Sequence, residues 1–193
     1  MRDYFTQCGV PFDFVLFTNY EQQVRSFVDG DIDLAWNGPI AHVLSQQHLG
    51  EGKVHSLGMR DVDRDFESVI AVRKSSGISN VDQLSGTHAI TGASDSPQAH
   101  LIPVHWLVKK RGVTFASIKP FDLDMGKHGD TGMGEVKMLE SMAANATESV
   151  GILSRSMWER GIDGAIPSVD PVALRANFEV LEGKDNLPPV FDQ

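Results

Sequence analysis

Hydrophobic and polar positions follow two periods along the chain, and the alternation of these periods predicts a repeated strand–helix order. Short runs rich in Val, Ile and Phe predict strands, and apolar residues at helical spacing predict helices. Residues 1–8 are expected to end a helix at Gly9. Before residue 61, the pattern predicts strands at 12–18, 32–36 and 54–60, and helices at about 19–28 and 39–50. Strands that alternate with helices over short loops predict a parallel sheet covered by helices.

A charged bend at residues 60–65 separates this group from a second one. Two strand–helix groups joined near residues 60–70 predict two lobes, whose helix N-termini would face a shared cleft. A loop rich in Pro and Gly is expected before the last strand. The second group is predicted to contain strands at 68–73, 87–91, 118–121, 149–153 and 178–181, a helical turn at 80–84, and helices that end near residues 112, 146 and 160.

The stretch from Gly92 to Gly112 is the part of the sequence that most strongly suggests a binding site. A strand runs into small polar residues, and these run into a helix with Pro97 in its first turn. Ser94 or Asp95 is expected to cap this helix. Hydroxyls and free N–H groups at a helix N-terminus favour the binding of an anion. A capped strand–helix unit without any ligand explains the same local pattern.

Composition narrows the classes of function. The net charge of −9 and the pI of about 5.1 argue against nucleic-acid binding, since such binding requires many cationic side chains. The single cysteine, Cys8, excludes a disulfide within the chain. No apolar run reaches membrane-spanning length, and the given N-terminus has no apolar signal core, so no export signal is expected in this sequence.

The chain contains five informative segments, which are in order TNYEQQV, GDIDLAWNGPIAHV, GMRDVDRDFES, GASDSPQAHLIPVHWL and GKHGDTG. Together these segments resemble the phosphate, phosphite and phosphonate substrate-binding proteins of bacterial ABC importers. The resemblance extends from about Phe12 to Leu181, and it implies a two-lobed α/β fold of the type II periplasmic-binding-protein class. Each lobe would be a mostly parallel sheet flanked by helices.

The resemblance also implies lobe boundaries and an incomplete first lobe. Lobe one is expected at residues 1–66, lobe two at 67–182, and a segment crossing back towards lobe one at 183–193. The family's first strand, which lies in the middle of the lobe-one sheet, would precede residue 1, and family members continue beyond residue 193. The chain is therefore expected to be truncated at both ends relative to the family.

Matching positions imply a ligand-binding set drawn from both lobes. Relatives often carry an acid at the position of Ser154, so the serine leaves the ligand's protonation state and size open. The implied residues are Tyr20, Asn37, Ser94, Asp95, Ser96, His128 and Ser154. From the residues alone, Tyr20 also fits an amphipathic cover residue, Asn37 a helix N-cap and His128 an exposed loop residue.

The expected function is binding of a small phosphorus oxyanion in the cleft between the lobes, for uptake through an ABC transporter. The resemblance implies a periplasmic or membrane-associated extracytoplasmic location and possible contact with the transporter's membrane subunits. Self-association through the incomplete lobe is a further expectation. No cofactor or metal is expected, because His100 and His105 are not spaced for one helical face and no acid completes a site.

Two other functions stay open at this point. The first is an enzyme on the same fold that acts on a small metabolite, although no nucleophile with an adjacent base falls at the cleft positions. The second is a cytosolic domain that senses a ligand or binds a partner.

Overall fold

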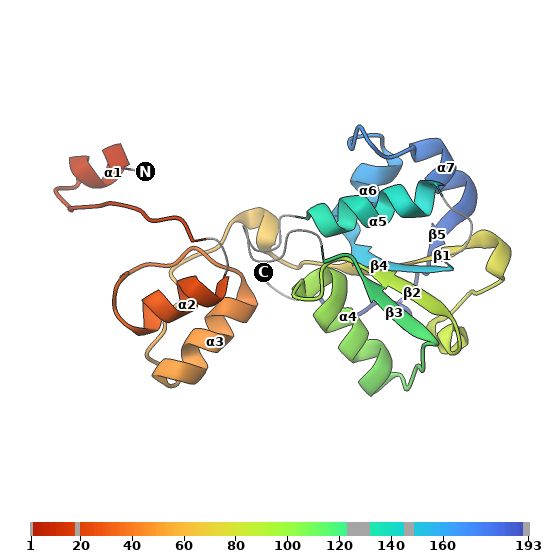
Figure 1. Ribbon diagram of the computed structural model, residues 1–193, viewed down its shortest axis with the longest axis horizontal. Coiled ribbons are helices and arrows are strands. Elements are labelled where there is room, and N and C mark those ends of the chain that lie inside the picture. Colours follow the sequence, from red (N-terminus) through yellow and green to blue (C-terminus); the bar gives the residue numbers. More distant parts are fainter. Residues whose placement is uncertain (1, 18–19, 123–131, 145–148, 191–193) are drawn as a thin grey trace.

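The computed structural model describes residues 2–17, 20–122, 132–144 and 149–190. An N-terminal part contains three helices, and a larger part built on one sheet begins at residue 68 (Figure 1). The N-terminal helices are α1 (Arg2–Gln7), α2 (Tyr20–Val28) and α3 (Pro39–Leu49). These helices agree with the expected positions, and Gly9 with a φ of 69° follows the end of α1.

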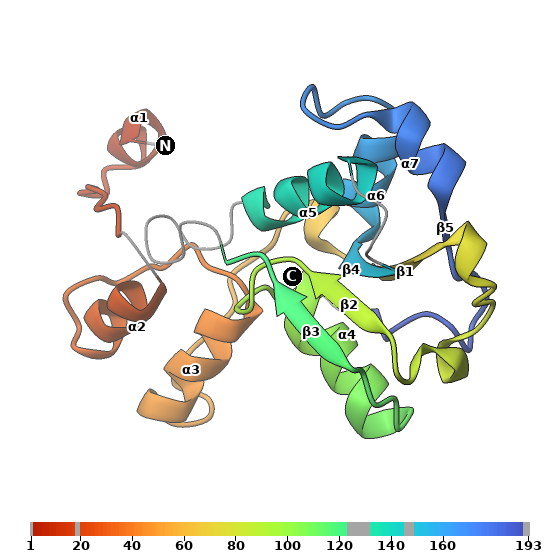
Figure 2. The same cartoon turned by 45° about the vertical axis from the view of Figure 1, so that its right-hand side comes forward.

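The sheet has five strands in the order β3-β2-β4-β1-β5. Strand β2 is parallel to β3 and β4, whereas β1 is antiparallel to β4 and β5, so every strand except β1 points the same way (Figure 2). The mostly parallel α/β fold is therefore confirmed. The strands are β1 (Ser68–Arg73), β2 (His88–Thr91), β3 (Ser117–Pro120), β4 (Val150–Ser154) and β5 (Phe178–Val180).

Helices cover both faces of this sheet, because the central strands are apolar on both sides. Along β1, Val69 and Ala71 belong to one core, and Ile70 and Val72 belong to the other. The first core contains side chains from the three helices α5 (Met133–Ala144), α6 (Arg155–Ile162) and α7 (Pro171–Asn177). The second core includes Leu107, from the helical run that contains α4 (Ile102–His105).

Helix α7 stands where the sequence pattern predicted only a loop. Asp170 caps it by accepting from the N–H groups of Val172 and Ala173, at 2.9 and 3.1 Å, and Pro171 is its first residue. A capping Asp followed by Pro is a helix-start signal. The prediction of a loop was therefore wrong because the turn residues on either side outweighed this signal.

The strands expected at 12–18, 32–36 and 54–60 are wrong, since the described residues of these segments form no strand. Leu16, Trp36 and Leu57 have exposed fractions of 85%, 70% and 80%, respectively. A strand exists only through hydrogen bonds to a neighbouring strand, and no described segment of the chain pairs with these three. The three segments therefore have the apolar pattern of strands but lack the inter-strand hydrogen bonds that a strand requires.

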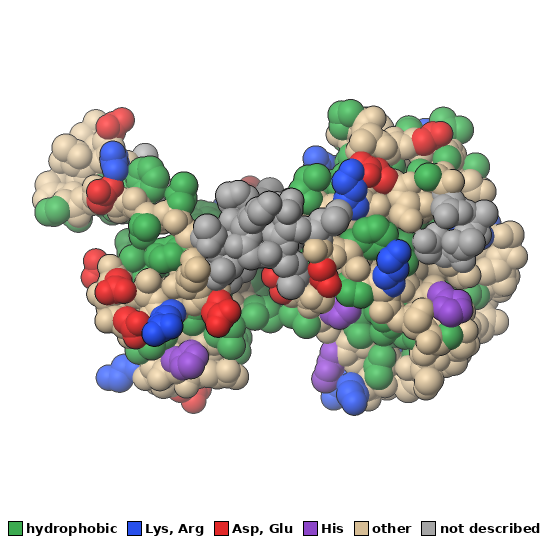
Figure 3. Space-filling view, in the orientation of Figure 1, with side chains coloured by type: hydrophobic (Ala, Val, Ile, Leu, Met, Phe, Trp, Pro, Cys, Tyr) green, Lys and Arg blue, Asp and Glu red, His purple; other side chains and the backbone are tan. Residues whose placement is uncertain are grey.

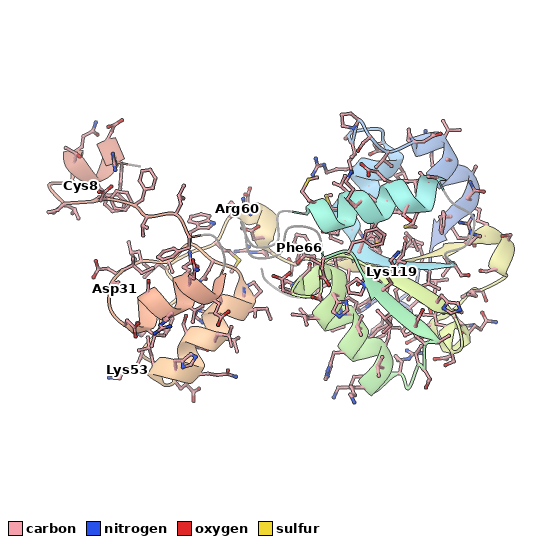
Figure 4. All side chains as sticks on the ribbon, in the orientation of Figure 1. Cys8, Asp31, Lys53, Arg60, Phe66 and Lys119 are labelled. Carbon is pink, nitrogen blue, oxygen red and sulfur yellow. The ribbon has the colours of Figure 1, made fainter. Side chains whose placement is uncertain are left out.

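Local contacts nevertheless hold the N-terminal part together. Helices α2 and α3 pack against each other, and the Nε2 of Gln23 donates to the carbonyl oxygen of Trp36 at 3.1 Å. The connection to the sheet passes Arg60 and Phe66 (Figure 4), and Arg60 forms a bidentate pair with Asp63 at 2.7 Å. In the described part of the chain, no helix has the length and apolarity needed to cross a bilayer.

The segment after β5 is bonded to the sheet-containing part. The Oδ1 of Asn186 accepts from the N–H of Val81 at 3.0 Å, and the Nη1 of Arg111 donates to the carbonyl oxygen of Asp185 at 2.8 Å. The lobe boundaries at 66 and 182, and the crossing role of residues 183–193, stay predictions.

Candidate functional site

The Gly92–Ser96 loop follows β2 and leads into one helical run at residues 97–110. Ser96 caps this run, because its Oγ accepts from the N–H of Ala99 at 3.3 Å and it directly precedes Pro97. The expectation of a cap at Ser94 or Asp95 was therefore wrong by one or two residues. Proline lacks the N–H that a first-turn residue leaves unbonded, so Pro97 fits the first helical position and fixes the cap at the residue before it.

Pro103 explains how the helical run is tied back to the loop. In an α-helix the N–H of residue 103 would donate to the carbonyl oxygen of Ala99, and proline has no such donor. The Ala99 carbonyl instead accepts from the N–H of Gly92 at 3.2 Å. The run is widened before and after α4, with the N–H of Leu101 bonded to the carbonyl of Ser96 at 2.9 Å. The loop is thus anchored at both of its ends.

Close packing of two glycines brings α5 against this loop. A Cβ at Gly92 would lie 2.4 Å from the Cβ of Ala99, and one at Gly134 would lie 2.6 Å from the carbonyl oxygen of Phe121. A Cβ at Gly134 would also lie 2.9 Å from the backbone nitrogen of Ala93. The start of α5, the end of β3 and the loop therefore approach each other to within backbone contact.

The end of β3 contributes a carboxylate to the loop. The N–H of Phe121 donates to the carbonyls of Thr91 and Gly92 at 3.1 and 3.3 Å. This places Asp122 beside the loop, where its Oδ1 accepts from the N–H of Ser94 at 2.6 Å. The sequence analysis did not single out Asp122. An acid directly after a strand, at the carboxyl edge of a parallel sheet, was the signal that could have identified it.

Ser154 lies at the end of β4, the strand beside β2, but its side chain is buried. Its N–H and its hydroxyl both donate to the Oε1 of Glu135, each at 2.6 Å. Its Oγ also caps α6 by accepting from the N–H of Met157 at 3.4 Å. Glu135 was not predicted, although it shares the helical stripe of the buried Met138 and Leu139.

His100 follows the loop on the first turn of the helical run, with its Nδ1 2.8 Å from the Oγ1 of Thr91. Burial lowers the pKa of His100 below its ordinary value, and the charge of Asp122 partly opposes this effect. The His100 side chain is half-buried, which agrees with a role in packing. Within the described residues, no group of three or more His, Cys, Asp or Glu side chains could hold a metal ion.

The structure thus brings Ser94, Asp95 and Ser96 together on one loop, with Ser154 at the end of the neighbouring strand. Tyr20 is the first residue of α2, and its side chain lies outside what the structure describes. Asn37 is half-buried before α3, whose N-cap is Gly38, so Asn37 is not the cap. His128 lies outside the described residues.

Comparison with known proteins identifies the family. The family model for the periplasmic substrate-binding protein of phosphonate ABC transporters matches residues 3–132. A probable ABC transporter phosphite binding protein, PhnD1 of Prochlorococcus marinus (strain MIT 9301), is 24% identical over 163 residues. That match covers 81% of this chain and 51% of the relative, so the chain spans about half the length of this curated relative.

Solved structures share the fold at lower identity. PhnD1 of Prochlorococcus marinus in complex with methylphosphonate superposes with a TM-score of 0.61 at 20% identity, covering 99% of this chain and 65% of PhnD1. A phosphonate transporter binding protein of Pseudomonas aeruginosa gives 0.55 at 17% identity, covering 99% and 58%. XAC2383 of Xanthomonas citri, bound to ATP, gives 0.62 at 18% identity, covering 97% and 65%. The fold is thus that of type II periplasmic binding proteins, and the chain belongs to the family of periplasmic substrate-binding proteins of phosphonate ABC transporters.

Proposed function

We propose that this chain binds a small phosphorus oxyanion (phosphate, phosphite or a phosphonate) for uptake through an ABC transporter. The observation that carries the proposal is the Gly92–Ser96 loop, which joins the carboxyl end of β2 to a helical run in a member of this family. Ligands of open parallel sheets bind at the carboxyl ends of the strands. A helix N-terminus adds a partial positive charge there.

The proposed contacts come from the loop, from the N-terminal part, and from His128 and Ser154. Ser94 and Asp95 are half-buried, so the loop is partly open to solvent, whereas Ser96 is fully buried and supports the loop as a cap. Tyr20, Asn37 and His128 remain predicted ligand contacts, and Ser154 remains one whose hydroxyl already donates to Glu135. Each charge-assisted hydrogen bond contributes about 1.5–3 kcal/mol, so about five or six give micromolar affinity after ordering costs.

The experiment is a calorimetric titration of methylphosphonate into wild-type protein and into the variant Ser94→Ala. Loss of one hydroxyl that donates to the anion is expected to weaken binding by about tenfold or more. Ser76→Ala is the matched control, because Ser76 follows β1 and therefore lies at the opposite edge of the sheet. If the wild type and Ser94→Ala bind methylphosphonate with equal affinity, the hydroxyl of Ser94 does not contact the ligand.

Family membership supports a proposal on the location of the chain and on its contact with a transporter. The family's members are periplasmic substrate-binding proteins, and we propose an extracytoplasmic location and delivery of the ligand to transporter membrane subunits for this chain. The family serves transport, so we propose binding without chemical turnover. An unchanged phosphorus NMR spectrum of methylphosphonate after prolonged incubation with the protein would support this, and a new phosphorus species would contradict it.

Self-association is proposed for the N-terminal part. Exposed apolar side chains gather there (Figure 3), on the three segments whose predicted strands do not form. Apolar residues of this kind include Phe14, Val15, Leu16, Leu34, Trp36, Leu57 and Met59. Unpaired backbone beside such side chains is able to pair with a second copy of the chain.

A further inference from the structure

Arg155, the first residue of α6, is bonded to the connector, residues 60–67, that joins the N-terminal part to the sheet. Its backbone N–H donates to the carbonyl oxygen of Glu67 at 2.9 Å, which continues the antiparallel pairing of β1 and β4 one residue beyond Ser68 and Ser154. The Nε of Arg155 also donates to the Oε2 of Glu67. The end of the connector is thus held to the start of α6 through its backbone and through a side chain.

Glu182, on the segment after β5, provides the guanidinium group of Arg155 with a second carboxylate. The Nη1 of Arg155 lies 3.4 Å from the Oε1 of Glu182. The backbone on either side of Glu182 is itself anchored. The N–H of Leu181 donates to the carbonyl oxygen of Ile70 at 2.9 Å, and the Nδ2 of Asn186 donates to the carbonyl oxygen of Glu182 at 2.9 Å. Arg155 therefore joins the connector to a fixed corner of the sheet-containing part.

Local helix preference does not account for an arginine at this position. The helix dipole disfavours a cation in the first turn of a helix, whereas two nearby carboxylates favour it. The planar guanidinium group has five N–H donors in a fixed geometry, so one arginine serves both carboxylates at once. An isolated ion pair at the surface contributes little to stability, but this pair belongs to a network of three charges, and the Arg155 side chain is only 26% exposed.

The connector determines how the two parts of the chain are placed relative to each other. Helices α2 and α3 pack on each other, and among the described elements no helix of the N-terminal part packs extensively against a helix or strand of the sheet-containing part. We propose that Arg155 is a latch, whose contacts with Glu67 and Glu182 hold the connector on the sheet-containing part. Loss of these contacts frees the N-terminal part to change its orientation. This inference goes beyond the proposed function and holds whatever ligand the chain binds.

Hydrogen exchange of two neighbouring backbone amides tests the latch. The N–H of Arg155 donates to the connector, whereas the N–H of Ser154 donates to the Oε1 of Glu135. In the double variant Glu67→Gln with Glu182→Gln, NMR is expected to show the Arg155 amide exchanging about fivefold faster than in the wild type. The Ser154 amide is expected to keep its rate, which shows that the fold is retained. Residues 154 and 155 are unchanged in this variant, so their intrinsic exchange rates are the same.

Glu140→Gln is the matched control. It removes a carboxylate whose partner, Lys137 at 2.7 Å, lies in the same helix α5, and it is expected to leave the exchange of the Arg155 amide unchanged. If the Arg155 amide exchanges at the wild-type rate in the double variant, the two carboxylates do not hold the connector and the proposal is wrong.

Distances between two spin labels test the effect on orientation. In a Cys8→Ser background, labels at His48→Cys on α3 and Val172→Cys on α7, both exposed positions, report the distance between the two parts. An excess of unlabelled protein suppresses distances between copies. Pulsed electron paramagnetic resonance is expected to give a wider distance distribution when the two glutamine substitutions are added. Faster amide exchange with a distribution of unchanged width would overturn the proposed control of orientation.

Discussion

The Oε1 of Glu135 accepts two hydrogen bonds from Ser154, one from its N–H and one from its hydroxyl, each at 2.6 Å. Glu135 is 2% exposed and Ser154 is 1% exposed, so water does not replace these bonds. The contact joins the first turn of α5 to the end of β4, next to Gly92 at the start of the candidate loop.

Removal of this acceptor is expected to destabilise the fold. In Glu135→Ala, two buried donors of Ser154 lose their partner, and each buried group left unsatisfied costs about 1–3 kcal/mol. Glu135→Gln keeps an amide oxygen as an acceptor and is expected to lose less. Urea unfolding measures both variants, with Glu159→Gln, on the exposed side of α6, as the control. Equal stability of the wild type and Glu135→Ala would contradict the structural role.

Gly92 is expected to tolerate no side chain. The Cβ of Gly92→Ala would lie 2.4 Å from the Cβ of Ala99 and 3.0 Å from the Cγ of Glu135. Overpacking of this kind typically costs about 1–3 kcal/mol, and here it would also displace the loop. Thermal unfolding is the measurement. Gly58→Ala, where a Cβ meets nothing within 4 Å, is expected to change stability little; a similar loss in both variants would argue against the close contact.

Stability is expected to depend on pH through His100. Burial lowers its pKa below 6.5, whereas in the unfolded chain the imidazole titrates near its ordinary value. Between these two values the unfolded state binds more protons, so stability is fully present above about pH 6.5 and falls as the pH drops towards the folded-state pKa. The free energy of unfolding is measured at pH 7.5 and at pH 5.5, about one unit above and below 6.5. The difference between the two values gives this loss of stability.

The variant His100→Gln is expected to reduce that pH dependence, because a glutamine does not titrate. The exposed His105 provides the control His105→Gln, which is expected to keep the wild-type slope. An unchanged slope in His100→Gln would assign the pH dependence to other groups.

Self-association is expected to depend on the exposed apolar residues of the N-terminal part. Leu16 is 85% exposed in the first of the three segments without strand pairing. Light scattering after gel filtration is expected to show mass increasing with protein concentration, and Leu16→Glu is expected to reduce this increase. Val172→Glu, at a 67% exposed position on α7, serves as the control. A monomer at every concentration would contradict the proposed contact.

The sheet and its helices could be predicted from the sequence because their signals are local and their partners lie in the same chain. The run Ser68–Arg73 reads as a strand and is one, since β4 and β5 lie on either side of it. Residues 12–18 carry an equally strong strand pattern but form no strand in their described portion, because strand formation depends on a partner that local sequence does not report.

The candidate site was predictable only in part for a similar reason. The serines of the loop stand in a recognisable strand–loop–helix pattern, whereas Asp122 and Glu135 reach the loop through contacts between distant segments. Asp122 is 28 positions from Ser94, and Glu135 is 19 positions from Ser154. Spacing along the chain gives no sign of such contacts, since they arise from the order of strands in the sheet.

The most direct measurement of the central claim is a thermal-shift series on the wild-type chain with phosphate, phosphite, methylphosphonate, 2-aminoethylphosphonate and sulfate. A ligand present at about a hundred times its Kd stabilises the folded state by about 2.7 kcal/mol, which raises Tm by several degrees in a chain of this size. The account predicts a selective rise with at least one phosphorus oxyanion and little or none with sulfate. A cooperative unfolding transition that none of the phosphorus oxyanions shifts would contradict it.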